Sequence, residues 1–156
     1  MTDQPFFAPI EDPEDCPYYL ISRTSLQVTA ALRKGLVDAG VPQVKPAYLG
    51  VLISLWRTDG SKAVELGRQA GLEPSTMTGL VDRMERDGLV HRQADTDDRR
   101  VQRIFLTAEG RDLHKPLLQA ITTVLSKVFD GISQEELLQA MSVLRQVLKN
   151  AGEGRK

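Results

Sequence analysis

The sequence predicts one mainly α-helical domain with a small β component (α+β). Apolar residues recur at helical spacing along most of the chain, whereas residues 89–107 hold two short apolar runs around a charged tip. A length of 156 residues is that of one domain, and 41% hydrophobic and 26% charged residues are typical of globular proteins. We therefore expect one folded unit in which a single β-hairpin lies among several helices.

Residues 1–17 form an acidic, proline-rich arm. Four prolines deny this segment a continuous helix, so we expect an extended chain that lies across a partner. Its carboxylates, which no lysine or arginine of the arm matches, are Asp3, Glu11, Asp12, Glu14 and Asp15. Because these residues contribute to a net charge of −1, the rest of the chain is more basic than the total suggests.

Two helices are expected before residue 61. Apolar residues at helical spacing predict the first over 18–39, with Gly40 at its C-terminal cap. Pro46 suits the first turn of the second helix, which ends at Asp59-Gly60.

Two shorter helices follow, over 61–70 and 74–87. We expect Ser61 to cap the first, which ends at Gly71. The buried side of the second consists of Met77, Leu80, Val81 and Met84. Two short helices joined by a three-residue turn are typical of a helix-turn-helix, here at about 61–87, whose second helix enters a DNA major groove.

The hairpin at 89–107 then completes a winged helix-turn-helix over 46–107, in which it is the wing. Thr107 is the expected N-cap of a long helix over 108–130, and Pro116 should kink that helix. Ser133 and Glu136 have the spacing of a capping box at the start of a last helix over 133–149.

The flanking N- and C-terminal helices are predicted to be dimerisation helices. The segments 18–39, 108–130 and 133–149 carry broader apolar faces than a small winged helix can cover. A symmetric homodimer would bury them and hold two recognition helices about 34–36 Å apart, at successive major grooves.

The outward face of the second short helix offers hydroxyls and arginines, which bind phosphates and base edges. The DNA-contacting residues that we expect are Ser75, Thr76, Thr78, Arg83 and Arg86 of the helix and Arg92, Arg99 and Arg100 of the hairpin. Arg92 has two open interpretations, a phosphate contact or a local pair with an aspartate of the wing. Asp98 is expected to orient a wing arginine through a charge-assisted hydrogen bond.

The stretch STMTGLVDRMERDGLVHRQADTDDRRVQRIFLTAEG, residues 75–110, closely resembles the MarR (multiple antibiotic resistance regulator) family of bacterial transcription factors. The resemblance lies in Thr78, Leu80, Val81, Asp82, Arg83, Met84, Gly88-Leu89-Val90, Arg92, Asp98, Arg100, Leu106-Thr107 and Gly110. It continues more weakly through PAYLGVLISLWRTDG at 46–60 and covers most of 18–150, the expected MarR-type domain. Gly79 stands where the family often has a longer, frequently basic residue, which removes one expected groove contact.

The resemblance implies a homodimer with two winged helices on a near-palindromic operator. It further implies a repressor that blocks promoter access and releases DNA when a small ligand or an oxidant changes the spacing of its two lobes.

Four residues are candidates for sensing a ligand or an oxidant. Cys16, in CPYYLISR, is loosely similar to the reactive cysteine of the peroxide-sensing branch of the family; the alternative is an ordinary thiol at a helix start. Tyr48, Trp56 and His114 are candidates to line a crevice where family members often bind phenolic anions; the alternative is that they are core residues.

Several functional classes are not expected. The chain has no Ser-His-Asp order, glycine-rich phosphate loop or metal-ligand spacing, so we expect neither an enzyme nor a cofactor. The acidic start and the lack of an apolar run of roughly 20 residues predict a cytoplasmic protein with no membrane partner. The alternative function is a winged-helix protein-interaction module without DNA binding, and substitutions on the outward face of 75–86 and at Arg99 and Arg100 discriminate between the two.

Overall fold

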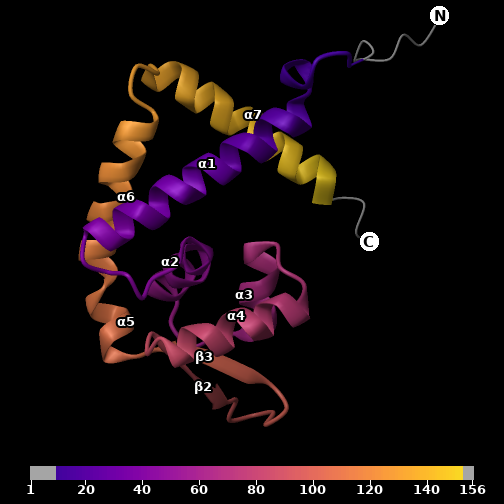
Figure 1. Ribbon diagram of the computed structural model, residues 1–156. Coiled ribbons are helices and arrows are strands. Elements are labelled where there is room, and N and C mark those ends of the chain that lie inside the picture. Colours follow the sequence, from indigo (N-terminus) through magenta and orange to yellow (C-terminus); the bar gives the residue numbers. More distant parts are fainter. Residues whose placement is uncertain (1–9, 153–156) are drawn as a thin grey trace, which may run out of the picture.

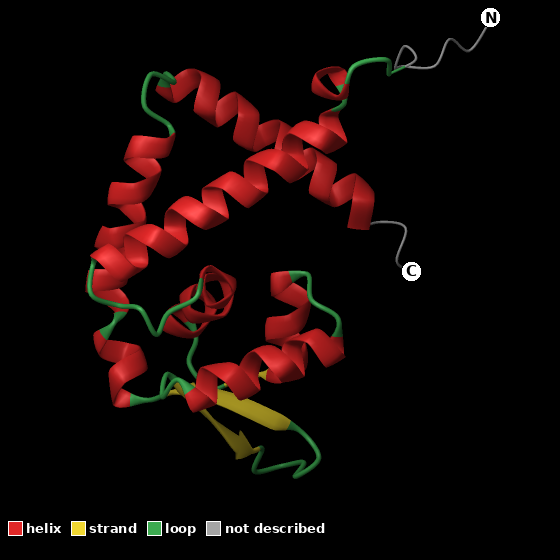
Figure 2. Ribbon diagram, viewed as in Figure 1, coloured by secondary structure: helices red, strands yellow, loops and turns green. Residues whose placement is uncertain are grey.

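The computed structural model describes residues 10–152, and it is mostly helical with one small sheet (Figures 1 and 2). A winged lobe, residues 46–107, lies beside three longer helices of residues 17–38, 114–128 and 134–152, which we call the frame helices. The elements are η1 Pro13–Asp15, α1 Pro17–Asp38, η2 Pro46–Tyr48, α2 Leu49–Arg57, β1 Ser61–Lys62, α3 Ala63–Ala70, α4 Pro74–Arg86, β2 Val90–Ala94, β3 Gln102–Leu106, α5 Ala108–Asp112, α6 His114–Val128 and α7 Gln134–Gly152.

The acidic arm is only partly within the described residues, because residues 1–9 lie outside them. Contrary to the prediction, its remaining part is not fully extended. Pro13–Asp15 form one 3-10 turn, which begins where the Glu14 N–H donates to Asp12 Oδ1 at 2.9 Å. Proline suits the first position of such a turn because its missing N–H would have no partner there.

The helix-turn-helix forms as expected, with one correction at its start. Gly71 ends α3 in the left-handed conformation, and Pro74 begins α4. Ser61, however, does not cap α3, because it pairs with Ile104 as part of strand β1. A strand of two residues is too short to leave a periodic pattern, so the sequence gives no sign of it.

The sheet has the antiparallel order β1-β3-β2, and the β2–β3 hairpin is the predicted wing. Val90 lies opposite Leu106, and both side chains are buried. Arg92, the next residue but one, therefore lies on the same face as Val90 and opposite Ile104. This register places the arginine next to the helix that covers the sheet.

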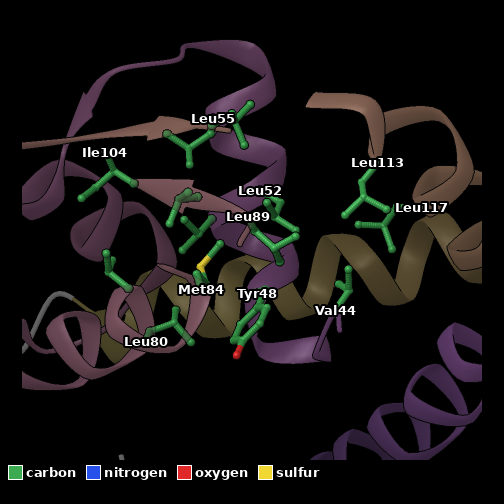
Figure 3. Close-up of a cluster of buried hydrophobic side chains, with 14 of the residues drawn as sticks. Val44, Tyr48, Leu52, Leu55, Leu80, Met84, Leu89, Ile104, Leu113 and Leu117 are labelled. Atoms are coloured by element: carbon green, nitrogen blue, oxygen red, sulfur yellow. The ribbon is translucent and has the colours of Figure 1, made fainter. Parts of the chain in front are cut away.

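The core of the winged lobe is built around α2, as Figure 3 shows. Leu52 of α2 meets Met84 of α4 and Leu89 near the start of the wing, and all three are fully buried. Burying each such side chain contributes about 1.5–3 kcal/mol relative to exposure. The predicted buried side of α4, Met77, Leu80, Val81 and Met84, is confirmed.

The helix expected over 108–130 is divided into α5 and α6 at Leu113, three residues before Pro116. Proline supplies no N–H to the carbonyl of residue 112 and its ring clashes with that carbonyl, so the helix breaks one turn upstream. The other predicted signals are confirmed: Thr107 caps α5 through the Gly110 N–H at 3.0 Å, and Ser133 and Glu136 form a capping box.

Large apolar side chains stay exposed on the frame helices. Helix α1 buries only Leu36, and α7 buries no residue. The exposed large hydrophobic residues on these two helices are Tyr18, Tyr19, Leu20, Ile21, Leu26, Val37, Leu138, Met141, Val143, Leu144, Val147 and Leu148. Apolar patches of this kind mark surfaces that bind another protein or a membrane. Between residues 10 and 152 no helix is both long and apolar enough to span a bilayer.

Candidate DNA interface

Helix α4 presents an exposed polar surface from its first turn to its last. Ser75, Thr76 and Thr78 are exposed near the N-terminus, and Arg86 is exposed in the last turn. The Thr78 hydroxyl donates to the Pro74 carbonyl at 2.9 Å, so its oxygen lone pairs remain available to a donor. The predicted helix contacts therefore lie on one accessible element.

Arg83 is exposed, but its guanidinium lies near the phenol of a core residue, Tyr48. Tyr48 is 1% exposed, and its hydroxyl donates to Asp87 Oδ2 at 2.7 Å. Burial and this hydrogen bond raise the pKa of Tyr48 to about 12, and the Arg83 guanidinium partly offsets the rise. Arg83 is thus exposed to solvent and at the same time interacts with Tyr48 of η2.

Arg92 has partners that neither interpretation of the sequence included. Its Nη2 lies 2.7 Å from Asp82 Oδ1 and donates to the Thr78 carbonyl at 3.1 Å, while Nη1 pairs with Glu85 Oε2. All three partners belong to α4, so the second of the two interpretations, a pair with a wing aspartate, is wrong. The cause is the register of β2 on β3, which places Arg92 on the face of the hairpin that α4 covers, away from the wing tip.

Asp95, which the sequence analysis did not single out, organises the wing tip. Its carboxylate accepts the N–H groups of Asp97 at 2.9 Å and Asp98 at 3.3 Å, and it pairs with the Arg103 guanidinium. Arg103 also donates to the Gly60 carbonyl at 2.8 Å. The backbone hydrogen bond from Asp97 and the bond from Arg103 lower the pKa of the Asp95 carboxyl. Burial, which leaves Asp95 only 6% exposed, acts in the opposite direction but is outweighed.

Asp98 does not hold an arginine side chain, which corrects that expectation. Its Oδ1 accepts the backbone N–H of Arg100 at 3.0 Å and so shapes the turn instead. Arg99 and Arg100 are exposed at the tip, and within residues 10–152 neither forms an ion pair. Both guanidinium groups are therefore exposed at the wing tip and available to phosphates.

The expected sensing residues do not form one cluster. Trp56 and His114 meet with ring centroids 4.7 Å apart, and the Trp56 indole donates to the Gly110 carbonyl at 2.9 Å. Tyr48 is a core residue bonded to Asp87, as the alternative interpretation held. Cys16 is a partly exposed thiol at the N-cap of α1 and makes no side-chain capping bond.

A cavity of about 460 Å³ lies instead between α1, the following loop and η2. It is mostly apolar, with Val37 and Val44 among its lining residues, and two cations, Arg33 and Lys45, also line it. The sequence offers no signal for this cavity, because its lining residues come from α1 and from the separate segment 42–47, which only the fold brings together. Among residues 10–152 no group of histidine, cysteine and carboxylate side chains is arranged to hold a metal ion.

Comparison with known proteins identifies the family. The MarR family model matches residues 46–101. The HTH-type transcriptional repressor MdtR of Bacillus subtilis is 32% identical over 108 residues, which are 69% of this chain and 70% of that protein.

Two solved structures are similar in fold and sequence. A MarR family transcriptional regulator from Rhodococcus sp. RHA1 has a TM-score of 0.76 at 29% identity and covers 88% of this chain and 95% of its own. CouR from Rhodococcus jostii RHA1, bound to p-coumaroyl-CoA, has a TM-score of 0.74 at 28% identity, covering 88% and 94%. With its helix-turn-helix, its wing and this sequence identity, the chain belongs to the MarR family of DNA-binding transcriptional regulators.

Proposed function

We propose that the protein is a repressor that binds a near-palindromic operator as a homodimer, through α4 and the tip of the β2–β3 wing. The observation that carries this proposal is the pairing of an exposed hydroxyl and arginine surface on α4 with the two uncommitted arginines of the tip, Arg99 and Arg100. Helix α4 suits the major groove, and the tip arginines suit the negative minor groove beside it. As such a regulator it acts on the chromosome, in the cytoplasm, and has no enzymatic role.

The dimer that we propose is formed by α1, α6 and α7. These helices leave large apolar side chains exposed, and covering them would contribute about 25 cal/mol for each Å² of apolar surface removed from water. A two-fold axis through them would present two copies of α4 to one face of a duplex. Similarity to MdtR, which is named a transcriptional repressor, supports the repressor function of this dimer and not its interface.

The effector that we propose is an aromatic organic anion in the cavity beside η2. Val37 and Val44 would contact its apolar body, while Arg33 and Lys45 would attract its negative group. The cavity lies between helix α1 and the start of the winged lobe, so a bound ligand would change the position of one relative to the other. The p-coumaroyl-CoA bound to CouR, itself an anion with an aromatic ring, supports this class of ligand.

Selection of binding sites from random duplex DNA tests the proposal. We expect a palindrome, bound with an affinity that falls steeply as salt rises because phosphate contacts release counterions. Arg100→Ala should weaken binding strongly, whereas Lys127→Ala, which removes an exposed cation in the last turn of α6, should not, once light scattering shows that both variants are dimers. Failure to enrich any site, under reducing and oxidising conditions alike, would favour the protein-interaction alternative.

A further inference from the structure

Arg92 ties the wing to one stripe of the recognition helix. Its side chain binds Thr78, Asp82 and Glu85, which follow one another at i, i+4 and i+7 along α4. Its backbone N–H also donates to Glu85 Oε1, at 2.8 Å. Helix α4 lies over the β2–β3 hairpin in Figure 1, and these bonds are the polar part of that contact.

The carboxylates of this stripe are unfavourable next to DNA. The Asp82 side chain is 52% exposed on a helix that faces phosphates in the proposed complex, and Glu85 is 31% exposed. Unpaired carboxylates there would repel the duplex. Pairing with Arg92, whose side chain is 25% exposed, cancels much of the negative charge that these carboxylates present to the duplex.

We propose that Arg92 is a positioning residue for operator binding: it acts on DNA through Asp82 and Glu85, by neutralising their charges, and not by its own phosphate contact. The inference rests on the proposed function. Arg92 donates two bonds from Nη2 and one from Nη1, so its guanidinium is held against α4 from two sides.

A set of charge-neutralising variants tests this role on the operator recovered by site selection. Arg92→Met should weaken binding by about tenfold or more, since it leaves two carboxylates unpaired beside the phosphates. Asp82→Asn with Glu85→Gln should bind at least as well as the wild type. The triple variant that combines all three changes should recover most of the lost affinity.

A direct phosphate contact gives a different pattern. The triple variant would then bind as weakly as Arg92→Met, and both would lose about 0.9 from the slope of log affinity against log salt. That result would overturn the inference. Lys34→Met with Asp38→Asn is the matched control, because it removes an exposed ion pair outside the winged lobe. Once light scattering shows that this variant is still a dimer, its binding should be unchanged.

Two further readouts keep the outcomes separate. Urea unfolding of each variant establishes that the protein tested is folded, so that a loss of affinity reports on the interface. If the wild type itself selects no operator, the proposed function fails and this inference fails with it. If the wild type binds and neutralising the carboxylates restores nothing, only the inference fails.

Discussion

The indole N–H of Trp56, on α2, donates to the carbonyl of Gly110, on α5, at 2.9 Å. This bond joins the winged lobe to the start of the C-terminal helices. Gly110 also lies against the backbone of Leu89, because a Cβ at position 110 would be 2.1 Å from the Leu89 carbonyl oxygen. The winged lobe and α5 are therefore packed together, and the helix break at Leu113 separates α5 from α6.

Gly110→Ala should lower the free energy of unfolding by about 1–3 kcal/mol, because the new methyl group meets a backbone oxygen that cannot move freely. Urea unfolding measures this change. Gly79→Ala is the matched control, since its new methyl group would meet only the end of Arg83, at 3.6 Å. That variant should be more stable by up to about 1 kcal/mol, as expected for a glycine inside a helix. Equal effects at the two positions would contradict the account of the joint.

The stabilising contribution of Asp95 should depend on pH. Its pKa is lower in the folded protein than in the unfolded chain, so the contribution is fully present above the unfolded value of about 4 and is lost as pH falls through the folded value. Asp95→Asn removes this dependence. The difference in unfolding free energy between wild type and variant should therefore narrow as pH is lowered below about 4. A difference that stays constant across the acid range would refute the role of the ionised carboxylate.

Tyr48 should have the opposite pH dependence. Its folded pKa of about 12 exceeds the unfolded value, so its contribution is present below about pH 10 and is lost as pH rises toward the folded value. Tyr48→Phe removes the bond to Asp87 and should cost about 1 kcal/mol at neutral pH. Titration of phenol absorbance provides the check: the variant should lack the last tyrosine to ionise. Loss of a group that titrates near 10 instead would contradict the assignment.

Leu144→Glu should separate the dimer into single chains. Leu144 is 45% exposed on α7, and a carboxylate at that position would have to be buried in the proposed interface. Light scattering should give the mass of two chains for the wild type and of one chain for the variant. Gln146→Glu adds the same charge to the same helix near its partner Asn150, and it should stay dimeric. Two monomeric variants would mean that charge on α7, and not the apolar face, decides assembly.

Local patterns made most of the fold predictable. The buried side of α4 follows from the helical spacing of Met77, Leu80, Val81 and Met84, and helix ends at Gly71 and Thr107 follow from capping chemistry. Pro116 predicted a distortion, but a proline acts on the carbonyl four residues earlier, so the break lies at Leu113.

Features that depend on tertiary register were not predictable. The sequence places Asp98 beside two arginines, yet the hairpin register brings Arg103 to Asp95 and turns Arg92 toward α4. The cavity lined by Arg33 and Lys45 depends on how α1 packs beside η2, which no local pattern encodes. The roles proposed for Arg92 and for the effector cavity therefore depend on tertiary structure and not on local sequence.

The most direct test of the central claim is the spacing between half-sites in the selected operator. Two α4 helices held by one dimer must meet successive major grooves on one face of the duplex, about 10 base pairs apart. An insertion of about 5 base pairs between the half-sites turns one of them to the opposite face. We predict that this insertion reduces affinity to the level of a single half-site, while the same insertion outside the palindrome has no effect. Undiminished affinity after the central insertion would contradict a dimer that reads its operator with two copies of α4.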